Sequence, residues 1–271
     1  EKLKARLEKK WKIKQPFKSN PEIMIIENQL LPGELGKSTE HLLGYYYVQE
    51  ISSMLPMLTL APQPNELFLD LAAAPGSKTT QAAALMNNQG TIIANDPNLG
   101  RITVLSANLQ KVGASNVVIT RHDGVILCNK LKNLGMKFDK ILVDAPCSGE
   151  GNLRSNPKTF IMWNIKAINK LSRIQKKLAS SALEILKSGG ELLYSTCTHS
   201  PEENEEVIQH LLDNYDIEIE TISLPLKCRP GLTSWQDKTF SSELKKACRV
   251  YPQDNNTEGF FLCKIKKLGE K

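Results

Sequence analysis

The sequence predicts an α/β fold built on a mainly parallel β-sheet. From residue 67 onward, short apolar runs alternate with longer stretches of helical character, which is typical of repeated βα units. An acid or a cysteine follows several of these runs, as expected where ligands bind outside the carboxyl ends of strands. The chain has 271 residues, of which 41% are apolar, so it can hold one large domain with a small appendage.

Seven apolar runs are expected to form the sheet. They are residues 67–70, 91–96, 117–120, 140–144, 191–195, 217–219 and 259–262. Helices are expected over residues 79–86, 101–112, 168–186 and 202–212. The second helix stops at Gly113, the third stops at Gly189 and Gly190, and Pro201 lies near the first turn of the fourth.

Residues 1–60 are expected to form a small basic N-terminal subdomain, and residues 61–271 the main domain. A basic, helical start leads to an expected strand over residues 21–26, and a Pro-Gly pair marks the following turn. Residues 45–55 run into a helix, and the proline-containing stretch 62–65 closes the subdomain as a short linker.

The net charge of +6 favours an anionic partner. Two groups of cations carry much of this charge: Lys2, Lys4, Arg6, Lys9, Lys10, Lys12 and Lys14, and then Lys166, Lys170, Arg173, Lys176 and Lys177. Either group alone fits a solvated helix face equally well. Together they favour a surface that binds nucleic acid.

Composition also disfavours several classes of protein. No apolar run approaches the length of a membrane span and no signal-peptide pattern opens the chain, so we expect a cytoplasmic monomer that does not bind a membrane. The cysteines form no CxxC pair and no zinc-like spacing with the histidines, so no metal site is expected. A disulfide framework is not expected either, and the structural cysteines are interpreted as Cys128, Cys228, Cys248 and Cys263, most of them small buried apolar residues.

A turn without bulky side chains follows the first strand of the main domain. It consists of Ala72, Ala73, Ala74, Pro75, Gly76 and Ser77, and a helix begins near Thr79. Such a turn lets the backbone approach a ligand closely, and the positive end of the helix points at the same space. The GxGxxG and GxxxxGK[ST] signatures are absent from it, which disfavours nicotinamide and nucleoside triphosphate ligands.

Acids end the next two strands. Asp96 is placed to accept hydrogen bonds from a ribose diol, although Pro97 after it also fits a turn or helix-cap aspartate. Asp123 lies near the expected position of an adenine, and its alternative is again a turn acid. Arg101 either neutralises an acidic neighbour or faces solvent.

Two cysteines lie in loops at two further strand ends. Cys147 belongs to the segment DAPCSG (residues 144–149), and Cys197 to STCT (residues 195–198). A thiolate is a strong nucleophile, so two thiols beside a cofactor turn indicate covalent chemistry. The alternative for each is a buried thiol at a strand end, but Pro146 and Gly149 indicate a shaped loop around Cys147.

The ordered motifs resemble those of the RsmB/NOP family of S-adenosylmethionine-dependent RNA 5-methylcytosine methyltransferases. They are DLAAAPGSKT (residues 70–79), Asp96, Asp123, DAPCSG and STCT. The likeness runs from about Tyr45 to Lys264 and includes YVQEISS (47–53), PEENE (201–205), RVYP (249–252) and GFF (259–261). The family usually has Pro-Gly-Gly-Lys-Thr, where this chain has Ser77 for the second glycine. Cofactor binding should survive this change unless the position requires a positive φ.

The resemblance implies a Rossmann-like class I methyltransferase fold, with a mostly parallel seven-stranded sheet and helices on both faces. It implies that Cys197 attacks C6 of cytosine, that Cys147 assists proton removal and product release, and that Asp144 contacts the cytosine edge. Lys78 lies near enough to lower a thiolate pKa or contact the base. The expected contacts of S-adenosyl-L-methionine are Ala72, Ala73, Ala74, Pro75, Gly76, Ser77, Lys78, Asp96, Arg101, Asp123 and Asp144. The DAPC segment also resembles the nucleophile loop of DNA cytosine methyltransferases, so the reverse assignment of the two thiols stays open.

RNA is the partner that the resemblance implies. A compact chain of this type is most like the archaeal tRNA methyltransferases of the family, so tRNA is favoured and rRNA is the next choice. Methylation of another nucleobase is disfavoured because transfer to an exocyclic nitrogen needs no thiol adduct. An RNA-binding assembly factor with a vestigial cofactor pocket is disfavoured by the intact pair of thiols with Asp144.

Overall fold

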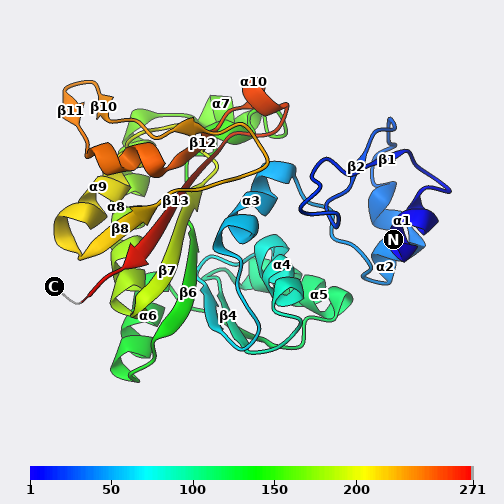
Figure 1. Ribbon diagram of the computed structural model, residues 1–271, viewed down its shortest axis with the longest axis horizontal. Helices are drawn as coiled ribbons and strands as arrows, with labels where there is room; N and C mark the ends of the chain where they lie inside the picture. Colours follow the sequence, from blue (N-terminus) through cyan, green and yellow to red (C-terminus); the bar gives the residue numbers. More distant parts are fainter. Residues whose placement is uncertain (270–271) are drawn as a thin grey trace. The chain divides into compact units, whose positions relative to one another are not determined.

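The computed structural model describes residues 1–269 of the chain (Figure 1). This part of the chain forms two compact units, Glu1–Val48 and a second unit that begins at Gln49. The boundary expected after residue 60 therefore lies on the other side of helix α3 (Ile51–Leu60). Leu55 of this helix is fully buried in the same core cluster as Phe68 of the sheet, so α3 packs as part of the second unit.

The first unit consists of short elements. They are α1 (Lys2–Leu7), β1 (Ile13–Lys14), β2 (Ile25–Ile26), η1 (Leu35–Lys37) and α2 (Thr39–Leu42). The expected helical start is confirmed, whereas only two residues of the expected strand 21–26 pair, antiparallel to β1. Its buried apolar residues are Leu7, Trp11, Phe17 and Ile23. A core this small is consistent with short elements joined by irregular loops.

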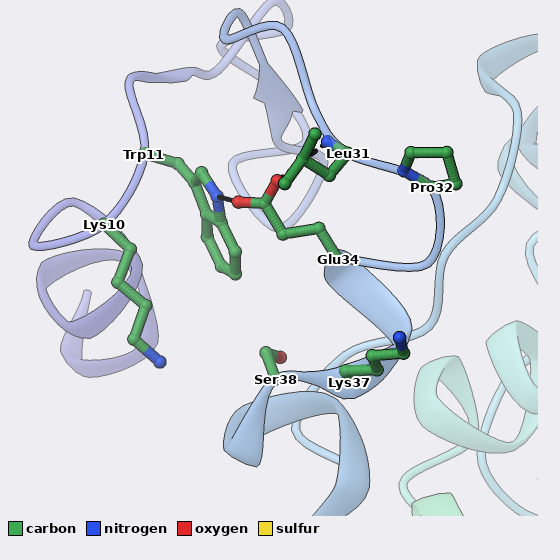
Figure 2. A pocket seen from close by; sticks show the side chains of 7 residues that line it. All are labelled: Lys10, Trp11, Leu31, Pro32, Glu34, Lys37 and Ser38. Atoms are coloured by element: carbon green, nitrogen blue, oxygen red, sulfur yellow. Dashed lines mark hydrogen bonds between the residues drawn. The ribbon is translucent and has the colours of Figure 1, made fainter.

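A pocket of about 460 Å³ lies within the first unit (Figure 2). Its lining residues are Lys10, Trp11, Leu31, Pro32, Glu34, Lys37 and Ser38. The indole Nε1 of Trp11 donates to Glu34 Oε1 at 2.7 Å, and this bond joins the chain after α1 to the start of η1. A hydrogen bond therefore connects two walls of the pocket.

The main sheet contains nine strands within residues 1–269 and has the order β5-β4-β3-β6-β7-β13-β12-β9, with β8 paired to β13. Their bounds are β3 (Leu67–Asp70), β4 (Thr91–Asn95), β5 (Val117–Thr120), β6 (Phe138–Asp144), β7 (Leu186–Thr196), β8 (Ile217–Glu220), β9 (Arg229–Pro230), β12 (Cys248–Val250) and β13 (Phe260–Lys267). All seven expected strands are present. The prediction of seven strands was wrong by two, because β9 at the edge of the sheet and β12 beside it are too short to form an apolar run.

The five strands β3 to β7 pair in parallel, and β13 pairs antiparallel with β7, β8 and β12. From β3 the chain builds outward to β4 and β5, and then returns to place β6 on the other side of β3. This reversal lies between β3 and β6. In open α/β sheets, such a reversal opens a crevice at the carboxyl ends of the strands where ligands bind.

The helices of the second unit cover both faces of the sheet (Figure 1). Besides α3 they are α4 (Ser77–Leu85), α5 (Leu99–Val112), α6 (Gly124–Asn133), α7 (Lys158–Met162), α8 (Ile165–Glu184), α9 (Glu205–Asn214) and α10 (Pro252–Asn255). One core cluster joins α6, α8 and α9 to the sheet, and a second joins α3 and α4 to it. Neighbouring strand residues such as Leu192 and Leu193 enter different clusters because side chains alternate along a strand.

Helix α6 has no counterpart among the expected helices. It begins because Asp123 Oδ1 accepts the backbone N–H groups of Val125 and Ile126. Helix α8 begins at Ile165, three residues before the expected start, because Asn164 Oδ1 caps it through Ala167 N at 2.8 Å. None of the described helices is long and apolar enough to cross a membrane.

The remaining elements of the second unit are short. They are η2 (Glu150–Asn152), η3 (Ser242–Lys246) and the hairpin of β10 (Ser234–Trp235) with β11 (Lys238–Thr239). One expectation about the cysteines was wrong, because Cys228 and Cys248 form a disulfide with Cα atoms 5.3 Å apart. The pairing of β9 with β12 brings the segments together, a proximity that the sequence spacing does not indicate. Cys128 and Cys263 are buried free thiols, as expected.

Candidate active site

The two thiols of the sequence motifs lie at the carboxyl ends of neighbouring parallel strands. Asp144 ends β6 directly across from Ser195 of β7, and the chain leaves both strands on the same side. Although fifty positions separate the cysteines in sequence, Cys147 Sγ lies 3.3 Å from Cys197 Sγ. The predicted thiol pair is therefore assembled by strand register, and both cysteines are free.

The two thiols differ in acidity. The hydrogen bond with Cys147 lowers the pKa of Cys197, although burial opposes this shift. The same hydrogen bond, together with burial, raises the pKa of Cys147 well above its usual value. When the pair loses a proton, Cys197 therefore ionises first and Cys147 remains the proton donor.

Asn152 also stabilises the Cys197 thiolate, and sequence reasoning missed this residue. Its Nδ2 donates to Cys197 Sγ at 3.2 Å, and this bond lowers the pKa of Cys197 further. Asn152 ends η2, whose middle residue Gly151 donates its N–H to Cys197 O at 2.9 Å. A Cβ on Gly151 would lie 2.3 Å from Gly259 O, so only glycine lets these backbone segments meet.

Lys78 and Asp144 form a partly buried ion pair beside the thiols. Lys78 Nζ lies 2.7 Å from Asp144 Oδ2 and donates to Ser53 Oγ at 3.1 Å, while Ser195 Oγ donates to Asp144 Oδ1 at 2.7 Å. Burial alone would lower the pKa of Lys78, but the neighbouring Asp144 outweighs it and the pKa is raised. Lys78 is therefore a cation, and its charge lowers the pKa of Cys197.

The small-residue turn after β3 has the shape that the sequence predicts. Gly76 has φ +106°, and a Cβ there would lie 2.8 Å from Leu105 Cδ1, so this position requires glycine. Ser77 is the first residue of α4 and has no positive φ, so serine replaces the family's second glycine without backbone strain. The peptide bond between Ala74 and Pro75 is cis.

The acids after β4 and β5 have different local partners. Asp96 is fully buried, accepts the N–H of Asn98 at 2.9 Å, and lies 2.8 Å from Arg101 Nη1. Arg101 also donates to Ala74 O, so it neutralises its acidic neighbour rather than facing solvent alone. Asp123 caps α6, as its turn-acid alternative predicts. Its contact with adenine stays a prediction.

Asp70, the first residue of the cofactor motif, is a buried acid whose pKa burial raises to about 6. Its Oδ2 accepts Thr79 Oγ1 at 2.7 Å, while its Oδ1 has no hydrogen-bond partner. Because the folded-state pKa lies above the unfolded value near 3.8, protonated Asp70 stabilises the fold fully below that value. This stabilisation, roughly 3 kcal/mol, is lost as the pH rises through about 6.

The variant Asp70→Asn stays neutral and should not show this loss. Between about pH 4 and pH 7, its free energy of unfolding should rise relative to that of the unmodified protein by up to roughly 3 kcal/mol. Urea unfolding at several pH values measures this difference. In the control Asp139→Asn, the carboxyl that is lost has a lowered pKa, so its contribution to stability changes below about pH 4. Between about pH 4 and pH 7 the control should therefore run nearly parallel to the unmodified protein. Parallel pH profiles for Asp70→Asn and the unmodified protein would contradict the prediction.

Two glutamates that sequence reasoning assigned no role support the cysteine loops. Glu203 is fully buried, and its Oε2 accepts Ser148 N at 3.1 Å and Gln175 Nε2 at 2.7 Å. Glu150 Oε2 accepts Thr198 Oγ1 and His199 N, each at 3.1 Å. The only signal for Glu203 was its place in the PEENE block, and the resemblance gave that block no chemistry.

A buried ion pair joins the end of the Cys197 loop to the sheet edge. Arg249 of β12 donates through Nε to Glu205 Oε1 at 2.6 Å and through Nη2 to Glu205 Oε2, and both side chains are almost fully buried. Its Nη1 donates to His199 O at 3.0 Å, and the ring of His199 stacks on that of Tyr251 at 4.9 Å. No cluster of metal-ligating side chains is found within residues 1–269.

The strand order, the small-residue turn and the acids at successive strand ends define a Rossmann-like S-adenosylmethionine-dependent methyltransferase. A sequence model of the family described as "16S rRNA methyltransferase RsmB/F" matches residues 57–266. The chain belongs to this RsmB/F methyltransferase family, and the resemblance noted from its motifs is confirmed.

Relatives of this family differ in how much of their length the chain covers. The tRNA (cytosine(49)-C(5))-methyltransferase of Pyrococcus abyssi is 42% identical over 266 residues, which are 98% of this chain and 83% of that enzyme. The ribosomal RNA small subunit methyltransferase F of Shewanella loihica is 42% identical over 240 residues, which are 87% of this chain and 47% of that protein. The crystal structure of a methyltransferase homolog protein from Pyrococcus horikoshii has a TM-score of 0.84 and 37% identity, covering 98% of this chain and 81% of that one.

Proposed function

We propose that the protein is an RNA cytosine-C5 methyltransferase that takes its methyl group from S-adenosylmethionine and acts on tRNA. The observation that carries this proposal is the thiol pair, in which Cys197 Sγ and Cys147 Sγ lie 3.3 Å apart and have pKa values shifted in opposite directions. A pair in which one thiol ionises before the other suits a reaction that begins with nucleophilic attack and ends with elimination.

The reaction needs covalent help because C5 of cytosine is a poor nucleophile. The Cys197 thiolate adds to C6, which gives the ring enamine character and places electron density on C5. S-adenosylmethionine would supply an electrophilic methyl group. C5 bonds to this methyl group while the bond from the methyl group to the donor sulfur breaks, and S-adenosylhomocysteine is the leaving group. A base removes the C5 proton, the C6–S bond breaks, and the electron pair of that bond returns to Cys197 as thiolate. Cys147 assists these last steps as the second sulfur at the site.

The Lys78–Asp144 pair provides charge next to the thiols. Asp144 contacts the amino and N3 edge of cytosine in this proposal, where charge changes as the thiolate adds. Ser195 Oγ and Lys78 Nζ, each 2.7 Å from one of its oxygens, hold the carboxylate in place. The negative charge of Asp144 raises the pKa of Cys197, and the positive charge of Lys78 counteracts this effect.

The residues present fit the methyl donor. Asp96 Oδ2 is buried without a hydrogen bond and has only its ion pair with Arg101, so a ribose diol can supply the missing donor. The turn of Ala72–Gly76 carries no side chain larger than proline, which leaves the backbone open to close approach. Ser77 and Lys78 in the first turn of α4, together with Asp123, complete the proposed set.

The choice of tRNA over rRNA follows the relatives. The Pyrococcus abyssi tRNA enzyme aligns with 98% of this chain and the Shewanella loihica methyltransferase F with 87%, each at 42% identity, so the tRNA enzyme matches more of this chain. We also propose that the protein acts in the cytoplasm as a monomer. Ribosomal RNA remains the alternative substrate, since the family model carries that description.

Methyl transfer itself tests the proposal. The protein is incubated with methyl-tritiated S-adenosylmethionine and either an unmodified tRNA transcript or a 16S rRNA transcript, and the RNA is digested to nucleosides. Label in 5-methylcytidine from tRNA is the expected result. Label found only in rRNA would identify rRNA as the substrate. Label in another nucleoside would contradict the proposed cytosine-C5 reaction. Retained RNA binding without any label would favour the assembly factor.

The proposed ribose contact predicts a loss of cofactor affinity in Asp96→Ala. Removing the carboxylate leaves the diol without its acceptor, so binding of S-adenosylmethionine should weaken by about 1–3 kcal/mol, measured by calorimetry. Asp139→Ala is the matched control, because it also removes an ion-paired aspartate, here the partner of Lys187 near the start of β6. If Asp96→Ala binds the cofactor as tightly as the unmodified protein, Asp96 is a turn residue only.

A further inference from the structure

The segment Leu153–Arg173 is strongly basic. It carries Arg154, Lys158, Lys166, Lys170 and Arg173 and contains no aspartate or glutamate. All five cations are exposed in the structure. A run of twenty-one residues with this balance repels cations and attracts a polyanion, so charge complementarity favours a nucleic-acid partner.

The same segment exposes large apolar side chains. Phe160 is 77% exposed, Ile161 is 82% exposed and Trp163 is 52% exposed. Thr159, directly before Phe160, is buried and lies against Gly149 of the Cys147 loop, so this side chain anchors α7. Phe160 of α7 and Trp163 just after the helix remain exposed. Exposed aromatic rings among cations are the combination that stacks on unpaired bases.

Hydrogen bonds join this surface to the loops that carry the two thiols. Trp163 Nε1 donates to Glu150 Oε1 at 2.5 Å, and Glu150 Oε2 accepts the N–H of His199 two residues after Cys197. Asn152, immediately before the segment, donates to the Cys197 sulfur itself. Arg154 Nη1 donates to Thr257 O just after α10. Figure 1 shows α7 and α10 at the same end of the unit. The surface is therefore continuous with the thiol pair.

We propose that residues 153–173 form a docking surface for single-stranded RNA, on which bases next to the target cytosine stack on Phe160 and Trp163. The cations of the segment hold the phosphates between these bases. This inference rests on the proposed function for the nature of the RNA. It adds a reason why the target must be unpaired, because a base in a duplex cannot present its face to an aromatic side chain.

Binding of an oligonucleotide in the absence of methyl donor tests the surface. The probe is a fluorescent single-stranded RNA of about 12 nucleotides, which is within the range of single-strand site sizes, and the same RNA paired to its complement is compared. Phe160→Ala and Trp163→Ala should each weaken binding of the single strand by about 5- to 150-fold. Lys158→Ala should reduce the slope of log affinity against log salt by about 0.7.

Two comparisons separate stacking from structural effects. Trp163→Phe keeps an aromatic face but loses the bond to Glu150, so it should retain most of the affinity that Trp163→Ala loses. Leu134→Ala and Lys130→Ala remove an exposed apolar residue and an exposed cation at the C-terminal end of α6, away from the thiols, and should bind as the unmodified protein does.

Unchanged affinity in both Phe160→Ala and Trp163→Ala would overturn the inference. That result would favour a protein as the partner of this surface. Equal losses in Trp163→Phe and Trp163→Ala would also overturn it, because Trp163 would then act through Glu150. Tighter binding of the duplex than of the single strand would exclude stacking. None of these results depends on methyl transfer, so a failure of the proposed function is detected separately by the labelled-methyl assay.

Discussion

Cys197→Ala should abolish methyl transfer to RNA while RNA binding persists. The side chain is the thiol with the lowered pKa, and it receives hydrogen bonds from Cys147 and Asn152. Without its sulfur nothing adds to C6, and C5 stays too weak a nucleophile to take a methyl group. Loss of a covalent nucleophile costs about 10⁴-fold or more in turnover, so 5-methylcytidine should fall below detection.

The measurement compares labelled 5-methylcytidine and oligonucleotide affinity for the same protein sample. Cys128→Ala is the matched control, because it also removes a buried free thiol, but from helix α6. The control should keep its activity. If Cys197→Ala still turns over, the nucleophile is Cys147, as the likeness of its loop to DNA cytosine methyltransferases allows.

Cys147→Ala should trap a covalent complex between the protein and RNA that survives denaturing electrophoresis. In the proposed reaction, Cys147 assists the steps that remove the C5 proton and release the product. Without it the C6–S bond persists after methyl transfer. The substitution also removes the hydrogen bond that lowers the pKa of Cys197, so less thiolate forms at neutral pH. The trapped complex should therefore accumulate faster as the pH is raised.

The double variant Cys147→Ala, Cys197→Ala is the control for this experiment, because it has neither sulfur at the site and should form no complex. Radiolabelled RNA on a denaturing gel measures the adduct at several pH values. Normal turnover by Cys147→Ala with no adduct would show that Cys147 has no part in release.

The positions of the reactive groups could be predicted because parallel strands converge at one edge of the sheet. Asp144, Cys147 and Cys197 each follow an apolar run, and the structure brings them together across β6 and β7. Which thiol ionises first could not be predicted, because that depends on a sulfur–sulfur contact between residues fifty positions apart. The role of Asp123 was also left open, because helix α6, which Asp123 caps, has no recognisable pattern in the sequence.

Other parts of the site carry no local signal in the sequence. Asn152 contacts Cys197 only because Gly151 lets the backbone pass close to Gly259, and a single sequence does not indicate such a crossing. Strands β9 and β12 contain two and three residues, too few for a periodic pattern. The Cys228–Cys248 disulfide was missed for the same reason, since Cys248 lies in β12 and Cys228 directly precedes β9.

The Arg249–Glu205 pair has a consequence for recombining this enzyme with its relatives. The guanidinium and the carboxylate are both buried, and each compensates the charge of the other. Removing one partner leaves an unpaired buried charge, which costs roughly 3–5 kcal/mol. A chimera whose crossover falls between residues 205 and 249 takes the two members from different parents, so both parents must carry this pair. The third donor contact of Arg249, to His199 O, means that a mismatched graft would disturb the backbone just beyond Cys197 as well as the sheet edge.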